Sequence, residues 1–252
     1  MSKSEWLKTV EHWKNKWPLY IEDYEDDSDG INLYTFVEIL NKFMTSNDIV
    51  VSDAGSAIYV PSQNLKMKHN QKFVLSGAQA DMGFSVPASI GVSLSSPDKN
   101  VLVFTGDGSF NSNIQELATI RNLNLPVKIF VWNNGGYLSI RNTQNKFYNG
   151  RVYGTSTENG LWFPEIKKIA DAYEFSYFLA EKNIDLENQI EEILQNSKPT
   201  LIEIKCKQDQ EIVPTLMLKK NPVTNQNIQC GLNDMYPFLS DEELCEEMIV
   251  DK

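Results

Sequence analysis

Gly106-Asp107-Gly108-Ser109 and, further along, Asn133-Asn134 each follow a strongly apolar run, and these two stretches indicate the fold. Residues 101–105, Val-Leu-Val-Phe-Thr, precede the first stretch, and residues 126–132, Pro-Val-Lys-Ile-Phe-Val-Trp, precede the second. Between them, residues 113–121 carry apolar side chains at helical spacing. The pattern predicts a strand–helix–strand unit with oxygen-bearing side chains at the carboxyl ends of both strands, where open parallel sheets bind ligands.

The rest of the chain continues this alternation of apolar strands and amphipathic helices. Such alternation predicts an α/β fold, with a parallel sheet of about six strands covered by helices on both faces. The expected strands are residues 49–52, 72–75, 101–105, 126–132, 176–180 and 200–205. The expected helices are residues 33–44, a short one near 57, and residues 82–94, 113–121, 164–173 and 185–195.

Three regions are expected: an N-terminal helix with an acidic linker (1–30), the α/β domain (31–207) and a C-terminal tail (208–252) that ends in a short helix. Residues 4–17 predict an amphipathic helix packed on the domain through a tryptophan-rich face. Residues 21–30 are acidic but do not form a calcium loop, because Phe36 stands where the bidentate glutamate is required.

Composition limits the classes of partner and location. The chain has 252 residues, a net charge of −11 and no basic stripe, so nucleic acid and anionic membrane are not expected partners. Its cysteines, Cys206, Cys230 and Cys245, are odd in number and widely spaced, which favours reduced thiols. The N-terminus lacks an apolar signal core, so a cytoplasmic location is expected.

The residue types after the two central strands suit a magnesium ion. Magnesium prefers hard oxygen ligands in octahedral geometry, with phosphates and water completing the shell. Asp107 offers a carboxylate, Asn134 offers an amide oxygen, and the flexible Gly135-Gly136 pair lets a main-chain carbonyl turn toward the same ion. Each stretch alone is more often a simple turn, but their order and their strand context favour a site.

Three other residues suit an anionic group beside that ion. Gly106 and Gly108 let the backbone approach a diphosphate closely, and the N–H groups near Ser109 point toward an anion at a helix start. A second candidate lies in residues 52–57, where a hydroxyl follows a glycine at a helix start. That hydroxyl is either a phosphate contact or an ordinary helix cap.

At this point a family resemblance appears. Residues 106–121, Gly-Asp-Gly-Ser-Phe-Asn-Ser-Asn-Ile-Gln-Glu-Leu-Ala-Thr-Ile-Arg, followed by Asn133-Asn134, resemble the diphosphate-binding motif of thiamine-diphosphate enzymes, in particular the large subunit of acetolactate synthase. The resemblance extends over roughly residues 4–205. It implies thiamine diphosphate and Mg²⁺ as cofactors, with the ion held by Asp107, Asn134 and the Gly136 carbonyl, and the decarboxylation or carboligation of a 2-oxo acid.

The resemblance also implies roles for the turn at residues 76–84. Met82 matches the bulky residue that props the cofactor in a bent shape, and the Ala80 carbonyl would accept a hydrogen bond from the cofactor's 4′-amino group. The residues alone favour a core-filling role for Met82. The complete set expected to contact the cofactor is Gly55, Ser56, Ala57, Ala80, Met82, Gly106, Asp107, Gly108, Ser109, Asn134, Gly136, Tyr137 and Leu138.

Two departures from the family pattern shape the expected function. Relatives use a glutamate from a pyrimidine-binding domain, which this chain is not expected to contain. It is therefore expected to be inactive alone and to work as a homo-oligomer or with a pyrimidine-domain partner, as part of a longer enzyme or as a subunit of a split 2-oxo acid decarboxylase. Thr143 stands where acetolactate synthases carry a tryptophan, and Arg141 is either a substrate anchor or a surface residue. A catalytically silent, cofactor-binding or regulatory homologue is the remaining alternative.

Overall fold

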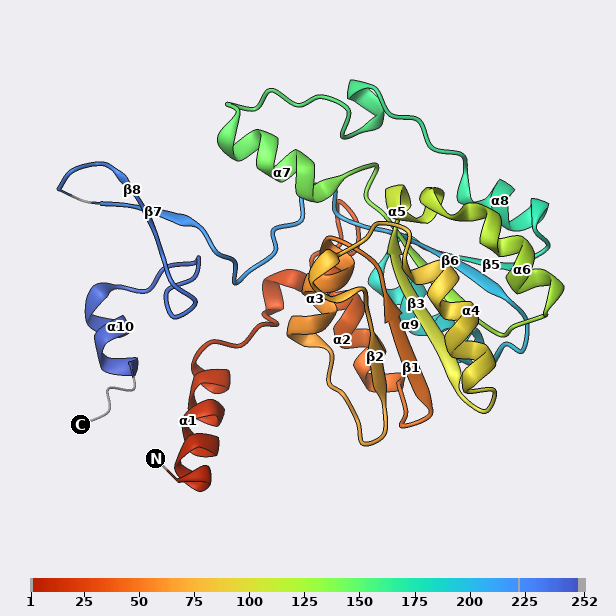
Figure 1. Ribbon diagram of the computed structural model, residues 1–252, viewed down its shortest axis with the longest axis horizontal. Coiled ribbons are helices and arrows are strands. Elements are labelled where there is room, and N and C mark those ends of the chain that lie inside the picture. Colours follow the sequence, from red (N-terminus) through yellow and green to blue (C-terminus); the bar gives the residue numbers. More distant parts are fainter. Residues whose placement is uncertain (1, 222, 249–252) are drawn as a thin grey trace. The chain divides into compact units, whose positions relative to one another are not determined.

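The computed structural model describes residues 2–221 and 223–248 (Figure 1). Two compact units emerge from the contacts within the chain, Met1–Gln210 and Glu211–Lys252. Residue 1 of the expected N-terminal region, and residues 222 and 249–252 of the expected tail, lie outside the described residues. The three-region division expected from the sequence stays a prediction.

A six-stranded, all-parallel sheet forms the centre of the first unit, in the order β2-β1-β3-β4-β6-β5 (Figure 1). The predicted α/β fold is thereby confirmed. The chain passes outward from β1 to β2 and then returns to start β3 on the other side of β1, so the order reverses between β1 and β3. The strands are β1 Asp48–Ser52, β2 Lys72–Val74, β3 Asn100–Gly106, β4 Lys128–Asn133, β5 Ser176–Ala180 and β6 Thr200–Lys205.

Helices cover both faces of this sheet (Figure 1). The longer helices of the first unit are α1 Lys3–Lys16, α2 Leu33–Phe43, α3 Ser56–Asn64, α4 Ser85–Ser95, α7 Leu138–Phe147 and α9 Asn183–Gln195. The shorter ones are α5 Asp107–Ser112, α6 Leu117–Asn122, α8 Ile166–Ala172 and the 3₁₀ turns η1 Glu22–Glu25, η2 Gly77–Gln79, η3 Ile114–Glu116 and η4 Thr157–Asn159.

Alternate residues of each strand serve opposite faces, as the pleat of a strand requires. On one face, Val101 and Val103 of β3 join a buried cluster with residues of α4, α6 and α8. On the other face, Phe104 of β3 and Phe130 of β4 pack against Phe36 of α2, with ring centroids 5.5 and 5.4 Å apart. Because both faces are buried, the central strands carry continuous apolar runs instead of alternating with polar residues.

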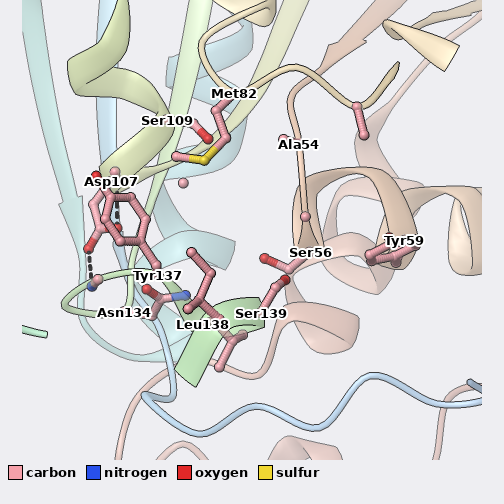
Figure 2. A pocket seen from close by; sticks show the side chains of 16 residues that line it. Ala54, Ser56, Tyr59, Met82, Asp107, Ser109, Asn134, Tyr137, Leu138 and Ser139 are labelled. Atoms are coloured by element: carbon pink, nitrogen blue, oxygen red, sulfur yellow. Dashed lines mark hydrogen bonds between the residues drawn. The ribbon is translucent and has the colours of Figure 1, made fainter. Parts of the chain in front are cut away.

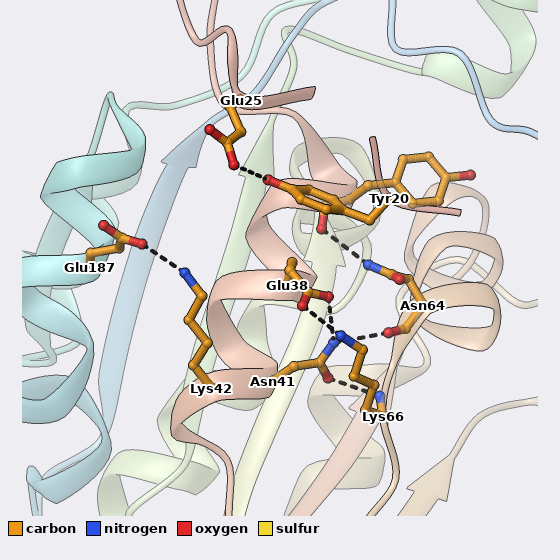
Figure 3. A network of polar contacts seen from close by, with 9 residues as sticks. Tyr20, Glu25, Glu38, Asn41, Lys42, Asn64, Lys66 and Glu187 are labelled. Carbon is orange, nitrogen blue, oxygen red and sulfur yellow. Dashed lines mark hydrogen bonds and ion pairs between the residues drawn. The ribbon is translucent and has the colours of Figure 1, made fainter. Parts of the chain in front are cut away.

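Polar side chains of α2 hold this helix against α3 and α9 (Figure 3). Asn41 donates to the carbonyl of Asn64 at the end of α3 (3.0 Å) and accepts from the Lys66 amide (2.9 Å). Lys42 reaches Glu187 of α9 at 3.2 Å. These contacts join α2 to the helices on either side of it, and they set the position of α3, whose first turn faces the ligand edge of the sheet.

Three expectations about helices were wrong in detail. The helix predicted over 113–121 is divided into η3 and α6, and a further short helix, α5, precedes them and starts directly at Asp107. The helix predicted from residue 82 begins instead at Ser85, because Gly83 has a φ of +84°, outside the helical region. No residue of α1 is buried and Trp6 is 44% exposed, which contradicts an N-terminal helix buried against the domain.

The second unit, in its described residues, contains a small hairpin of β7 Leu218–Lys220 and β8 Asn227–Gln229, and the short helix α10 Asp241–Glu247. The expected terminal helix is therefore present. Lys219 of the hairpin pairs with Asp234 at 3.5 Å and with Asp241 at 3.3 Å, which ties the hairpin to the start of α10. Within residues 2–221 and 223–248, no helix combines the length and apolar character needed to cross a bilayer.

Candidate functional site

A cleft of about 290 Å³ lies over the carboxyl ends of β1, β2, β3 and β4 (Figure 2). It sits beside the reversal between β1 and β3, the position at which open parallel sheets bind ligands. Met82 and Leu138 project into the cleft from opposite sides (Figure 2). The residues lining it are Ala54, Gly55, Ser56, Tyr59, Ala80, Met82, Gly106, Asp107, Gly108, Ser109, Asn134, Gly136, Tyr137, Leu138, Ser139 and Ile140.

Asp107 is the buried charge of this cleft, with 3% of its surface exposed. Its carboxylate accepts hydrogen bonds from the amides of Gly108 (2.7 Å) and Gly136 (3.0 Å). Burial raises the pKa of Asp107 to about 6, although these N–H donors and the charge of Arg141 oppose the rise. A nearby cation would favour the ionised form, so the site is suited to a positive ligand.

Asn134 supplies a second oxygen at the tip of the neighbouring strand. Its Oδ1 is fully buried and has no hydrogen-bond partner among the described residues. An unpaired buried oxygen is costly unless it coordinates something. No group of three or more His, Cys, Asp or Glu side chains comes together in the described chain, so a cation here needs amide, carbonyl and ligand oxygens. The donor set matches magnesium in type.

Glycine is required at two positions of the cleft by direct contact. A Cβ on Gly108 would lie 2.2 Å from the ring of Tyr137, which covers this part of the backbone. A Cβ on Gly136 would lie 2.0 Å from the carbonyl oxygen of Thr155, and Gly136 also has a φ of +147°. Because the Gly136 amide is directed at Asp107, this glycine joins the tips of β3 and β4.

The turn that carries Ala80 and Met82 is fixed by a buried aspartate. Asp53, directly after β1, accepts hydrogen bonds from the Gly83 amide (2.9 Å) and from the amide and hydroxyl of Ser85 (3.0 and 2.6 Å). Ala80 adopts the left-handed conformation with a φ of 51°. Met82 is 43% exposed, so it is a cleft residue and not a core filler in this chain.

The structure brings twelve of the thirteen expected cofactor contacts to this one cleft. The exception is Ala57, which is buried in the first turn of α3, where its carbonyl accepts a hydrogen bond from Ser52. Ala54, Tyr59, Ser139 and Ile140 also line the cleft and were not predicted. Their positions depend on how α3 and α7 approach each other, which no local pattern encodes.

Arg141 is neither a substrate anchor nor a surface residue. Its buried guanidinium contacts Asp209 (2.9 Å), the carbonyl of Thr155 (3.4 Å) and the carbonyl of Gln208. It therefore clamps α7 to the chain that follows β6. Thr143 is exposed on α7, donates to the Ser139 carbonyl at 2.9 Å, and lines an open hollow of about 870 Å³ next to the cleft.

Comparison with known proteins agrees with this geometry. Residues 53–204 match the family described as the thiamine pyrophosphate enzyme, C-terminal TPP binding domain. The chain belongs to this family. The matched region begins at Asp53 and includes every strand tip that forms the cleft. Membership supports thiamine diphosphate as the cofactor.

Curated relatives include acetolactate synthase large subunits. That of Lactococcus lactis subsp. lactis (strain IL1403) is 28% identical over 84% of this chain and 36% of the relative, and that of Buchnera aphidicola subsp. Schlechtendalia chinensis is 29% identical over 87% and 39%. The chain thus spans under two fifths of the length of these relatives. A solved structure, Rhodococcus jostii RHA1 thiamine diphosphate-dependent 4-hydroxybenzoylformate decarboxylase, matches with a TM-score of 0.65 at 24% identity, over 73% of this chain and 34% of that one, and shows the same fold.

Proposed function

We propose that this chain is the diphosphate- and magnesium-binding half of a thiamine-diphosphate-dependent 2-oxo acid decarboxylase or carboligase, similar to acetolactate synthase. The observation that carries the proposal is the pair formed by the ionisable Asp107 and the unpaired oxygen of Asn134 at adjacent strand tips. Magnesium would be held by these two side chains, the Gly136 carbonyl and the diphosphate. Gly108 and Ser109 would contact the diphosphate.

The turn at residues 80–83 has a separate task in this proposal. Met82 would support the bent cofactor, and the carbonyl of Ala80 would accept a hydrogen bond from its amino group. When bound, thiamine diphosphate supplies the nucleophilic carbon and the electron sink for removing carbon dioxide from a 2-oxo acid, while the protein contributes binding and orientation. The fixed Gly83 holds Met82 in place for this orientation.

A partner is the second part of the proposal. The residues that line the cleft include no glutamate in the described chain, and on the side formed by Tyr59 and Met82 these side chains are 52% and 43% exposed. We therefore infer that a pyrimidine-binding domain, in a homo-oligomer or a separate partner, covers that side and supplies the catalytic glutamate. Addition of pyruvate, magnesium and cofactor to this chain alone is expected to give no carbon dioxide release. Sustained release would contradict the need for that domain.

Titration calorimetry with thiamine diphosphate tests the site itself. Binding is expected with magnesium and not with EDTA, and Asp107→Asn is expected to remove the magnesium-dependent heat. Asp48→Asn is the matched control, because Asp48 is an equally buried strand-end aspartate at the opposite edge of the sheet. Absence of magnesium-dependent binding in the unaltered chain, or its persistence in Asp107→Asn, would refute the assignment.

A further inference from the structure

Another buried carboxylate, besides Asp107 and Asp53, lies near the same edge of the sheet and outside the cleft. Glu203 of β6 is 5% exposed and accepts from three donors on three different strands. These are Asn133 Nδ2 of β4 (2.7 Å), the Tyr177 hydroxyl of β5 (2.6 Å) and Lys205 Nζ of β6 (2.5 Å). The family assignment and the cleft leave this group without a role.

The contact to Asn133 has a consequence for the residue that follows it. While Nδ2 of Asn133 donates to Glu203, its Oδ1 accepts from the amide of Gly135 at 3.3 Å. The side chain of Asn133 thus closes the turn that contains Asn134 and ties this turn to β6. At its other end the turn is held by the Gly136 amide on Asp107.

We propose that Glu203 and Asn133 are positioning residues for the metal ligand Asn134. Asn134 has no hydrogen bond through Oδ1 among the described residues, so its direction depends on the backbone that carries it. Glu203 fixes that backbone from outside the cleft, in the way that outer residues commonly orient metal ligands. This inference rests on the proposed function, because it concerns the same ion.

Charge explains why a carboxylate suits this position. Burial alone would raise the pKa of Glu203, but the donors Lys205, Tyr177 and Asn133 together lower it, so the group remains charged and a strong acceptor. The pKa of Tyr177 is raised, first by burial and then by Glu203, so its hydroxyl remains a donor. A charged acceptor with fixed donors on both sides holds Asn133 more rigidly than a neutral one.

The test measures Mn²⁺ affinity in the presence of thiamine diphosphate by electron paramagnetic resonance. Glu203→Ala and Asn133→Ala are each expected to weaken Mn²⁺ binding by about 10-fold or more. If Glu203 acts through Asn133, the double variant loses no more affinity than either single one. Tyr177→Phe removes a different donor to the same carboxylate and leaves Asn133 in place, so its Mn²⁺ affinity is expected to change by less than about 3-fold.

Conservative and stability controls keep the test decisive. Glu203→Gln keeps an oxygen that can accept from Asn133, so it is expected to recover most of the affinity lost in Glu203→Ala, and it covers the case in which the alanine variant does not fold. Asp48→Ala removes a similar contact, to Asn100 at 2.7 Å, at the far edge of the sheet and should leave Mn²⁺ affinity unchanged. Additive losses in the double variant, or affinities like wild type in both single variants, would overturn the inference. Failure of the proposed function looks different, because wild type itself would then bind no Mn²⁺.

Discussion

Replacing Asp107 by asparagine is expected to affect stability and binding in opposite directions. The pKa of this carboxyl rises from an ordinary 3.8 to about 6, mainly because it is buried. That rise corresponds to about 3 kcal/mol of unfavourable free energy for the ionised form in the folded chain, at about 1.4 kcal/mol per tenfold change in the proton equilibrium. Asparagine carries no charge and avoids this cost.

The sign of the pH dependence follows from proton binding. Between pH 3.8 and about 6 the folded chain holds more protons at Asp107 than the unfolded chain, so stability falls as pH rises through that window. Above about pH 6 the full cost of the buried charge on Asp107, about 3 kcal/mol, is present. Asparagine at 107 places its own NH₂ group against one of the backbone N–H donors that the carboxylate accepted from. The lost hydrogen bond costs about 1–3 kcal/mol at every pH. The net gain at pH 7.5 is therefore about 0–2 kcal/mol, and at pH 4 the variant is the less stable protein.

Urea unfolding at pH 4, 5, 6 and 7.5, followed by circular dichroism, measures this difference. The free energy of unfolding of Asp107→Asn relative to wild type should rise by about 2.4 kcal/mol between pH 4 and pH 7.5, mostly below pH 6. Adding magnesium and thiamine diphosphate should stabilise wild type alone, by about 2.7 kcal/mol at a hundredfold excess over Kd. A difference between the two proteins that does not vary with pH would refute the reasoning.

Other substitutions test the framework around the cleft. Lys128→Met should stabilise the chain by about 1–2 kcal/mol at pH 7, because burial lowers the pKa of Lys128 to about 8. The gain in stability should vanish by pH 10, where the wild-type side chain is neutral. Equal effects at both pH values would contradict this. Gly136→Ala places a Cβ 2.0 Å from the Thr155 carbonyl oxygen, so Tm should fall by several degrees and an unchanged Tm would be inconsistent with the contact. Arg141→Met should lower the free energy of unfolding by about 2–4 kcal/mol in urea, whereas a substrate anchor would leave stability unchanged.

The central strands could be predicted from the sequence because their signals, an apolar run and a break at each end, are local. Strands such as β5 and β6 are short apolar runs with breaks at each end, and the structure gives them the predicted bounds. The helix α7 could not be read, because only Leu138 and Arg141 of its ten residues are buried and no apolar period results. Its position is set by tertiary contacts of Arg141, which carry no local signature.

The residues of the site likewise include some that the sequence predicts and some that it does not. Asp107 and Asn134 were predicted because parallel strands end at one edge, so residues after neighbouring strands meet. The roles of Asp53 and Glu203 were not, because each depends on partners about thirty to seventy residues away in the chain. A charged residue in or directly after a strand is usually a cap or a solvated group, and only the three-dimensional contacts distinguish Asp53 and Glu203 from that majority.

Three costly features of the first unit lie where β1, β2, β3 and β4 end. Asp107 is charged against its burial, the oxygen of Asn134 lacks a hydrogen bond among the described residues, and Ala80 holds a left-handed conformation. At the opposite edge, by contrast, the buried Asp48 is satisfied by Asn100 and by Thr45. Such costs persist at sites where a ligand relieves them. A cation bonded to Asp107 and Asn134, as the proposed magnesium site requires, would relieve two of the three at once.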